Sequence, residues 1–211
     1  MAEYKTGKMD REILCIKSNL LEGLFSGKDF VYNEKINILD KINKRTEYLR
    51  RGPLENDSHY RQIIPYTILI NGKDVFVYRR SNKVENYSET RLYEKYSLGV
   101  GGHTEKTKLK NVENILVNNA IREIKEETSV RINSGKLKLF GYIKLNYDVH
   151  KYHLSICYLA QTKSKNVKFR DKEITNGEYL NIDEIIRLSK KVDMEDWSKI
   201  LLKPLQTLLR K

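Results

Sequence analysis

Residues 101–130 read GGHTEKTKLKNVENILVNNAIREIKEETSV, and this stretch decides how the whole chain is interpreted. Its second part, residues 112–128, has the apolar spacing of an amphipathic helix. A helix turns by about 100° per residue, so these apolar residues share one face. We expect that face to pack on a sheet; it carries Val117, Ala120, Ile121, Ile124 and Thr128.

Three carboxylates gather on a neighbouring face of the predicted helix. Glu123, Glu126 and Glu127 stand at positions i, i+3 and i+4, where Cβ atoms are about 5–6 Å apart and like charges repel. They also lie near the C-terminal end of the helix, where the macrodipole disfavours negative charge. Helix stability alone therefore does not account for the cluster.

A divalent cation would account for it. Mg²⁺ and Mn²⁺ prefer oxygen ligands, and Arg122 can reach Glu126 at i+4 and orient its carboxylate. The two glycines at 101–102 add a backbone that can approach a metal or a phosphate closely. The alternative is an acidic face that is simply solvated.

Residues 122–130, REIKEETSV, resemble the signature helix of the Nudix hydrolase superfamily, the MutT-like enzymes. The family pattern is Gly, five residues, Glu, seven residues, then Arg-Glu-apolar-any-Glu-Glu-any-Gly-apolar. Asn114 stands where the first Glu belongs, Glu113 is one place off, and the loop after Gly102 is six residues longer than the family spacing. Ser129 replaces the family's Gly, so we expect a left-handed turn strained by about 1 kcal/mol there.

This resemblance implies a Nudix-type α/β/α sandwich with a mixed central sheet. It also implies an Mg²⁺- or Mn²⁺-dependent hydrolase that cleaves a diphosphate linkage in a nucleoside diphosphate derivative. The metal ligands would be the carboxylates of Glu123, Glu126 and Glu127 and a backbone carbonyl, that of Gly102 or its neighbour Gly101.

The resemblance implies further catalytic and substrate-binding residues. Arg122 belongs to the catalytic set, and the base that accepts the proton of the attacking water would be Glu123 or Glu173. Arg80, at the end of VFVYRR, and His103, after the two glycines, would meet the substrate. The stretches QIIPY, SLGVGGH and MEDWS resemble a subgroup of bacterial and phage Nudix proteins, over roughly residues 60–200.

Outside this stretch, the pattern predicts strands joined by short turns. We expect a hairpin of residues 62–70 and 75–80 around NGKD, with Pro65 favouring a sheet edge or an irregular entry into the strand. A helix is expected over 33–49, capped by Asn33, and another over 193–210, broken or restarted at Pro204. Further strands are expected at 12–16, 137–146 and 149–161, and a helix at 182–190.

The domain division that we expect is an N-terminal extension, residues 1–58, packed on a Nudix domain of residues 59–211. The extension could form a homodimer interface or cover a sheet edge. With only two cysteines, the chain has no disulfide framework. No apolar run approaches the roughly 18 residues of a membrane span, and we see no signal peptide, so we expect a cytoplasmic protein without membrane contact.

The formal net charge of +12 leaves alternative functions open. A basic protein attracts polyanions, so the alternative to catalysis is a non-catalytic Nudix-fold module that senses nucleotides or binds nucleic acid. Nucleic acid is the less favoured partner, because lysines are spread along the chain and no basic helix stands out.

Overall fold

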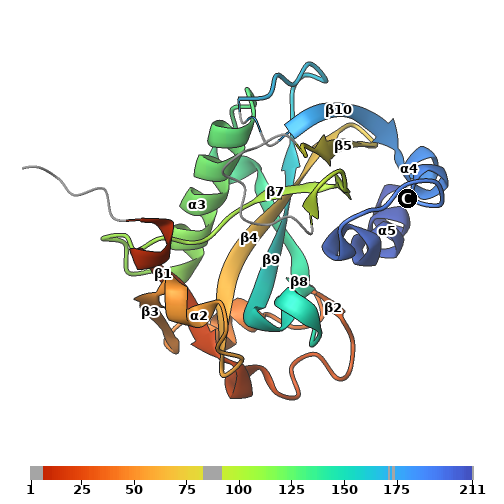
Figure 1. Ribbon diagram of the computed structural model, residues 1–211. Coiled ribbons are helices and arrows are strands. Elements are labelled where there is room, and N and C mark those ends of the chain that lie inside the picture. Colours follow the sequence, from red (N-terminus) through yellow and green to blue (C-terminus); the bar gives the residue numbers. More distant parts are fainter. Residues whose placement is uncertain (1–6, 83–91, 171, 173, 211) are drawn as a thin grey trace, which may run out of the picture. The chain divides into compact units, whose positions relative to one another are not determined.

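The computed structural model describes residues 7–82, 92–170, 172 and 174–210 (Figure 1). The strands are β1 (Glu12–Lys17), β2 (Phe30–Tyr32), β3 (Thr46–Arg50), β4 (Tyr60–Asn71), β5 (Asp74–Arg80), β6 (Tyr96–Ser97), β7 (Gly99–Gly101), β8 (Leu137–Ile143), β9 (His153–Gln161) and β10 (Ile174–Asn181). The α-helices are α1 (Ile38–Ile42), α2 (Arg51–Leu54), α3 (Val112–Glu127), α4 (Ile182–Leu188) and α5 (Asp196–Leu209). Short 3-10 helices are η1 (Lys8–Asp10), η2 (Ser18–Leu21), η4 (Ser134–Lys136) and η5 (Asp148–Tyr152).

Within the described residues, ten strands form one sheet, in which β10, β5, β4, β9, β8 and β2 follow one another. The chain divides into two compact units. The first unit comprises residues 1–65, 102–119 and 139–157, and the second comprises 66–101, 120–138 and 158–211. Strands β4, β8 and β9 and helix α3 each run from one unit into the other.

In the first unit, β1 pairs with β3 on one side and with the start of β4 on the other, both antiparallel. Strand β2 pairs with β8. A small core lies beneath β1, formed by the buried side chains of Ile13, Cys15 and Leu54. This ladder places residues 12–17 inside the sheet, so the strand expected at 12–16 is confirmed.

The helix expected over residues 33–49 is wrong for most of its length. Helix α1 covers only Ile38–Ile42, and Asn37, whose side chain accepts from the Asp40 amide at 3.3 Å, caps it in place of Asn33. The rest of the stretch, Thr46–Arg50, is β3 and pairs with β1. Pairing with a distant strand outweighs the weak helical spacing of this stretch.

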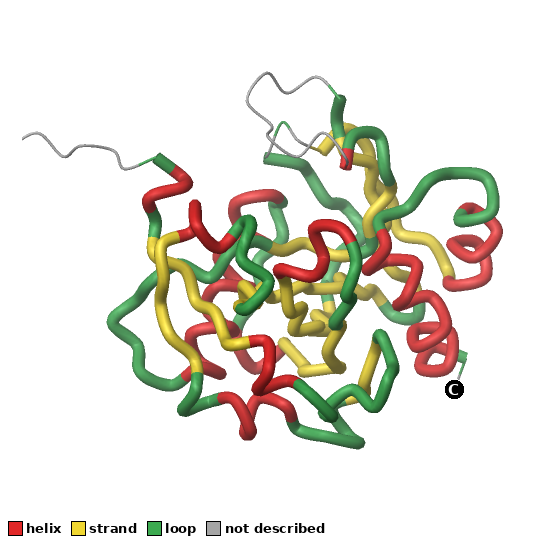
Figure 2. Tube along the Cα trace, turned by 60° about the horizontal axis from the view of Figure 1, so that its bottom comes forward, coloured by secondary structure: helices red, strands yellow, loops and turns green. Residues whose placement is uncertain are grey.

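In the second unit, β4 and β5 form the expected hairpin, closed at Asn71↔Asp74 with Gly72 at a φ of 61°. Strand β10 pairs with β5, and β7 pairs with β4. Helices α4 and α5 lie side by side at the C-terminal end of the chain (Figure 1 and Figure 2). The core of this unit gathers around the aromatic residues of β5 and the inner face of α3.

Two expectations about proline are wrong. Pro65 lies in β4, which has a neighbour on each side in the sheet. Strand β1 pairs with β4 as far as Gln62 and β7 pairs from Tyr66 onward, so Pro65 falls between the two ladders and its missing N–H interrupts neither. Pro204 lies inside the continuous helix α5, whose buried Leu201 and Leu205 hold it against the core.

Candidate active site

Helix α3 matches the expected helix closely. Asn111 caps it by accepting from the Asn114 amide at 3.0 Å. Ala120, Ile124 and Thr128 are buried as expected, and Ile124 belongs to the core of the second unit. Val117 and Ile121, also expected on this face, are only half-buried, and Ile115 and Leu116 are buried instead. Packing of this inner face fixes the direction in which the acidic face points.

The three carboxylates of α3 lie in different environments. Glu127 is buried, with 8% of its surface exposed. The side chain of Glu123 is 12% exposed, whereas that of Glu126 is 56% exposed. Across the acidic face, Glu127 and Glu123 are therefore sheltered from solvent, and Glu126 is open to it.

Arg122 joins two of these carboxylates. Its Nη2 donates to Glu123 Oε1 at 2.5 Å and its Nη1 donates to Glu126 Oε2 at 2.8 Å. The expected pairing with Glu126 at i+4 is confirmed. Because charge-assisted bonds of this kind are strong and directional, Arg122 fixes the positions of both carboxylates.

The described residues contain no group of three or more His, Cys, Asp or Glu side chains arranged closely enough to hold a metal ion. The donor chemistry nevertheless fits a hard divalent cation, because all three groups offer carboxylate oxygens. Among the described residues, the guanidinium of Arg122 offsets only part of the negative charge of the three carboxylates, which suits a divalent cation.

The chain leaves α3 without the expected left-handed turn. The residues with positive φ in the described chain do not include Ser129. Its amide donates to the Lys168 carbonyl at 2.7 Å, and its hydroxyl accepts from the Lys168 amide at 2.9 Å. Ser129 thus clamps the helix exit to the loop of residues 162–170, so the strain expected at this position does not arise.

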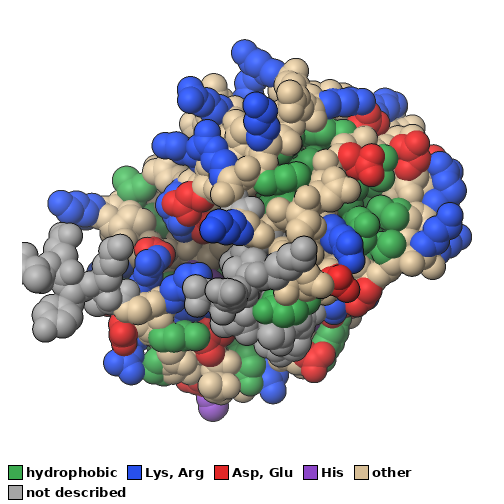
Figure 3. All heavy atoms as spheres, turned by 45° about the horizontal axis from the view of Figure 1, so that its top comes forward, with side chains coloured by type: hydrophobic (Ala, Val, Ile, Leu, Met, Phe, Trp, Pro, Cys, Tyr) green, Lys and Arg blue, Asp and Glu red, His purple; other side chains and the backbone are tan. Residues whose placement is uncertain are grey.

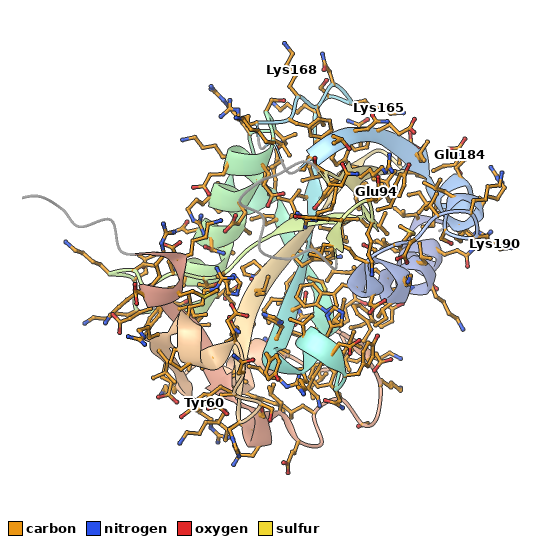
Figure 4. The ribbon with its side chains drawn as sticks, viewed as in Figure 1. Tyr60, Glu94, Lys165, Lys168, Glu184 and Lys190 are labelled. Carbon is orange, nitrogen blue, oxygen red and sulfur yellow. The ribbon has the colours of Figure 1, made fainter. Side chains whose placement is uncertain are left out.

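The same loop carries several basic side chains. In Figure 4, Lys165 and Lys168 extend outward from it, and Lys165 forms an ion pair with Asp74. Lys and Arg side chains are numerous on the face that Figure 3 presents, interspersed with acidic ones. This mixed distribution agrees with the spread of lysines in the sequence.

The glycines before α3 have different structural roles. A Cβ on Gly99 would come within 2.3 Å of the Tyr66 ring, so this glycine makes room for an aromatic side chain. Gly101 pairs with Tyr66 in the ladder between β7 and β4. The carbonyl of Gly102 accepts from Asn119 Nδ2 at 3.2 Å. A role of Gly102 as metal ligand stays a prediction.

Arg80, expected to meet the substrate, is held by a buried carboxylate. Its Nε donates to Glu195 Oε1 at 2.8 Å, and its guanidinium lies 5.4 Å from the centroid of the Tyr78 ring. The other oxygen of Glu195 accepts from the Ser97 hydroxyl at 2.7 Å. Sequence reasoning missed Glu195, although it lies in the quoted stretch MEDWS, because only the fold brings it to Arg80.

A buried hydroxyl network continues from this ion pair. The Tyr66 hydroxyl lies 2.8 Å from Ser97 Oγ and 2.9 Å from Ser198 Oγ, and the Leu98 amide donates to Ser198 Oγ at 3.0 Å. Burial, with the charge of Glu195 as a second cause, raises the pKa of Tyr66 above its ordinary value. The network ties the start of α5 to the segment between β6 and β7.

His103 is half-buried in the first unit. Its ring lies 5.8 Å from the ring of His153, centroid to centroid, and its Nε2 lies 3.9 Å from Glu55 Oε1. Burial and the nearby charge of Arg51 hold the pKa of His103 well below its usual range. A substrate-binding role of His103 stays a prediction. The role of Glu173 as catalytic base also stays a prediction, because Glu173 lies outside the described residues.

The predicted site residues divide between the two units. Arg122 and the three glutamates of α3 lie in the second unit, as does Arg80. Gly102 and His103 lie in the first unit. Within the described chain, no helix is long and apolar enough to cross a membrane.

No model of a protein family matches the chain. It is 28% identical over 208 residues to protein YmaB of Bacillus subtilis strain 168. The alignment covers 92% of this chain and 97% of YmaB. Its structure resembles the crystal structure of Tm1382, a protein provisionally described as a Nudix hydrolase, with a TM-score of 0.76, 25% identity and coverage of 93% and 99% of the two chains.

A second solved structure supports the same fold. The Nudix domain of Shewanella oneidensis NrtR, solved in complex with ADP ribose, matches with a TM-score of 0.52 at 12% identity, over 71% of this chain and 88% of that domain. The predicted α/β class with a mixed central sheet is confirmed by these likenesses. The chain therefore has the fold of the Nudix hydrolases.

Proposed function

We propose that this chain is a hydrolase that uses Mg²⁺ or Mn²⁺ to cleave the diphosphate linkage of a nucleoside diphosphate derivative. The observation that carries the proposal is the acidic face of α3, where Arg122 holds Glu123 and Glu126 in fixed positions. Its likeness over nearly its whole length to Tm1382 adds support. The resemblance of the stretches QIIPY and SLGVGGH supports the proposal that it belongs to the bacterial and phage subgroup.

The carboxylates of α3 would hold the metal. When bound, a divalent ion neutralises phosphate oxygens and lowers the pKa of a coordinated water. Glu126, the most exposed of the three, stands at the open end of the face, and Glu127 closes the sheltered end. Arg122 orients the carboxylates of Glu123 and Glu126 before a substrate arrives, so little reorganisation is needed on binding.

Glu123 is the base that we favour among the described residues. It is more sheltered than Glu126, and Arg122 orients its carboxylate through a 2.5 Å bond. A positioned, sheltered carboxylate is suited to accept the proton of an attacking water. Glu173 is the other candidate for this role.

A ligand bound to a protein of the same fold supports the substrate class that we propose. The Nudix domain of NrtR was solved with ADP ribose, a nucleoside diphosphate joined to a second sugar. We propose that this chain acts on a compound of the same class.

A substrate screen tests the proposal. The full chain is incubated with Mg²⁺ or Mn²⁺ and a panel of ADP-ribose, dinucleotide polyphosphates, sugar nucleotides, nucleoside triphosphates and capped RNA. We expect metal-dependent cleavage of at least one diphosphate that stops on chelation. Tight binding of a panel member without any turnover would instead favour the non-catalytic nucleotide-sensing module.

A further inference from the structure

A small polar pocket lies in the first unit, between the turn of residues 21–29 and the end of β8. It measures about 140 Å³ and its walls include Phe25, Lys28, Asp29, Lys144 and Asn146. The turn is unusual, because Gly23, Ser26 and Gly27 all have positive φ, at 73°, 47° and 73°. Ser26 adopts a left-handed backbone conformation that only glycine adopts without strain. The folded turn therefore tolerates a strained residue at this position.

The pocket carries two amino groups that lack a carboxylate partner. Within the described chain, neither Lys28 nor Lys144 forms an ion pair. The half-buried Lys144 donates to Asn146 Oδ1 at 3.3 Å, and its Nζ lies 5.6 Å from the centroid of the Phe25 ring. The only carboxylate among the described walls is that of the exposed Asp29.

A buried arginine stands behind the same wall. Arg61 is 6% exposed, and its Nη2 donates to Asn146 Oδ1 at 2.7 Å, the atom that also accepts from Lys144. Its Nη1 donates to three backbone carbonyls, those of Leu145, His150 and His153. Its Nε has no hydrogen-bond partner in the described structure.

Arg61 has no counter-charge among the described residues. Backbone carbonyls accept from its Nη1 and the Asn146 side chain accepts from its Nη2, but no carboxylate pairs with it. Burial lowers the pKa of Arg61 to about 10. Burial, with the charge of Arg61 as a second cause, also lowers the pKa of Lys144, and the charges of Glu22 and Asp29 oppose this shift. A charge taken out of water is costly unless an opposite charge accompanies it. An anion bound beside Asn146 would therefore offset the buried positive charge of Arg61.

We propose that this pocket binds a phosphate group. Lys28 and Lys144 would contact the oxygens directly, and Arg61, one hydrogen bond behind at Asn146, would supply a third positive charge. A water needs about 10–15 Å³ of cavity space, so a pocket of about 140 Å³ has room for a phosphate group. The carboxylate of Asp29 opposes an anion and weakens its binding.

A phosphate site here would give the N-terminal extension a ligand, because residues 21–29 belong to that extension. The site is independent of the proposed hydrolase activity, since its residues lie in the first unit, whereas Arg122 and the α3 glutamates lie in the second. The ligand could be free phosphate or the phosphate of a small monoester. The two sources share the same chemistry at the pocket and are separated by the probes below.

Thermal unfolding of the full chain tests the proposal. Inorganic phosphate and glycerol phosphate are titrated separately against chloride at constant ionic strength, without divalent metal. Ligand that binds only the folded state raises Tm in a saturable way. We expect such a rise with phosphate, and a larger one with glycerol phosphate if the natural ligand is a monoester.

Three variants and two controls make the test specific to this pocket. K28Q and K144Q should each raise the apparent Kd for phosphate at least about tenfold, and D29N should lower it. K17Q, an exposed lysine at the end of β1, should keep the wild-type response, as should E126Q on α3. A response that survives K28Q and K144Q unchanged, a weaker response in D29N, or no response above chloride would each overturn the proposal. Because Lys28 and Asp29 are exposed, the test stands even if K144Q does not fold.

Discussion

Arg80 Nε lies 2.8 Å from Glu195 Oε1, and the two side chains are only 11% and 8% exposed. The two residues are 115 positions apart in the sequence. They form a buried ion pair that Ser97 extends through a further bond to Glu195. Arg80, which the sequence alone predicts to meet the substrate, therefore pairs with Glu195 inside the second unit.

Removing one member of this pair should lower the stability of the folded protein. Leaving a buried charge unpaired costs about 3–5 kcal/mol, so E195Q is expected to lower the free energy of unfolding, measured in urea, by that order. Replacing both partners, in R80M with E195Q, should cost less than the sum of the single changes.

The exposed pair of Arg79 with Glu94, at 3.0 Å, is the matched control. Surface ion pairs contribute about 1 kcal/mol at most, so E94Q should be nearly neutral. An E195Q variant as stable as E94Q would show that the buried pair contributes no more than a surface contact.

The acidic face of α3 should be required for turnover and not for folding. E126Q and E127Q each remove one negative charge from the proposed metal site, and we expect metal-dependent turnover to fall at least about 100-fold. Activity assays over a range of Mg²⁺ concentrations, with circular dichroism to verify the fold, provide the measurement.

E178Q, on the exposed face of β10, is the matched control for these glutamates and should keep wild-type turnover. Full activity in E126Q or E127Q would remove the metal-site assignment. A loss that excess metal restores would locate the defect in metal affinity.

Ser129 gives a prediction that separates this chain from the family pattern. Because Ser129 has no left-handed backbone and its hydroxyl accepts from the Lys168 amide, S129G gains no relief of strain. We expect the free energy of unfolding to fall by about 1 kcal/mol through loss of that bond. S134G, at an exposed serine in η4, measures the general cost of a glycine, and a stabilised S129G would contradict the clamp.

The neighbouring histidines His103 and His153, whose rings lie 5.8 Å apart, predict a stability that depends on pH. Burial lowers the pKa of His153 to about 4, and that of His103 well below its usual range, whereas both titrate near 6.5 when unfolded. Between these values the unfolded chain binds more protons, so stability should fall as pH drops below about 6.5.

For His153 alone this loss approaches about 3 kcal/mol near pH 4. Urea unfolding at several pH values between 7 and 4 measures it. H153Q should flatten the slope in this range, and H59Q, at an exposed histidine beside Asp57, should leave it unchanged. Equal slopes for H153Q and the wild type would show that His153 titrates normally in the folded protein.

Local patterns in the sequence predicted local features. The bounds of α3, its buried face, the hairpin at residues 71–74 and the pairing of Arg122 with Glu126 all depend on neighbours within one or two turns. The site's acidic face follows from the same helical geometry. These features need no knowledge of distant residues.

Features that distant residues decide could not be predicted. Strand β3 replaces a helix because β1 pairs with it, and Pro65 is tolerated in β4 because two partner strands meet there. Glu195 reaches Arg80 only through the placement of α5. The cation cluster around Asn146 likewise joins residues from β4, the turn before β2 and the end of β8.

The interleaving of the two units has a consequence for the gene. Each unit is assembled from three separate stretches of chain, and β4, α3, β8 and β9 each contribute to both. No single cut in the coding sequence would release an intact unit, so neither half is available as a module for shuffling between proteins. Selection has to preserve or discard this chain as one inherited piece.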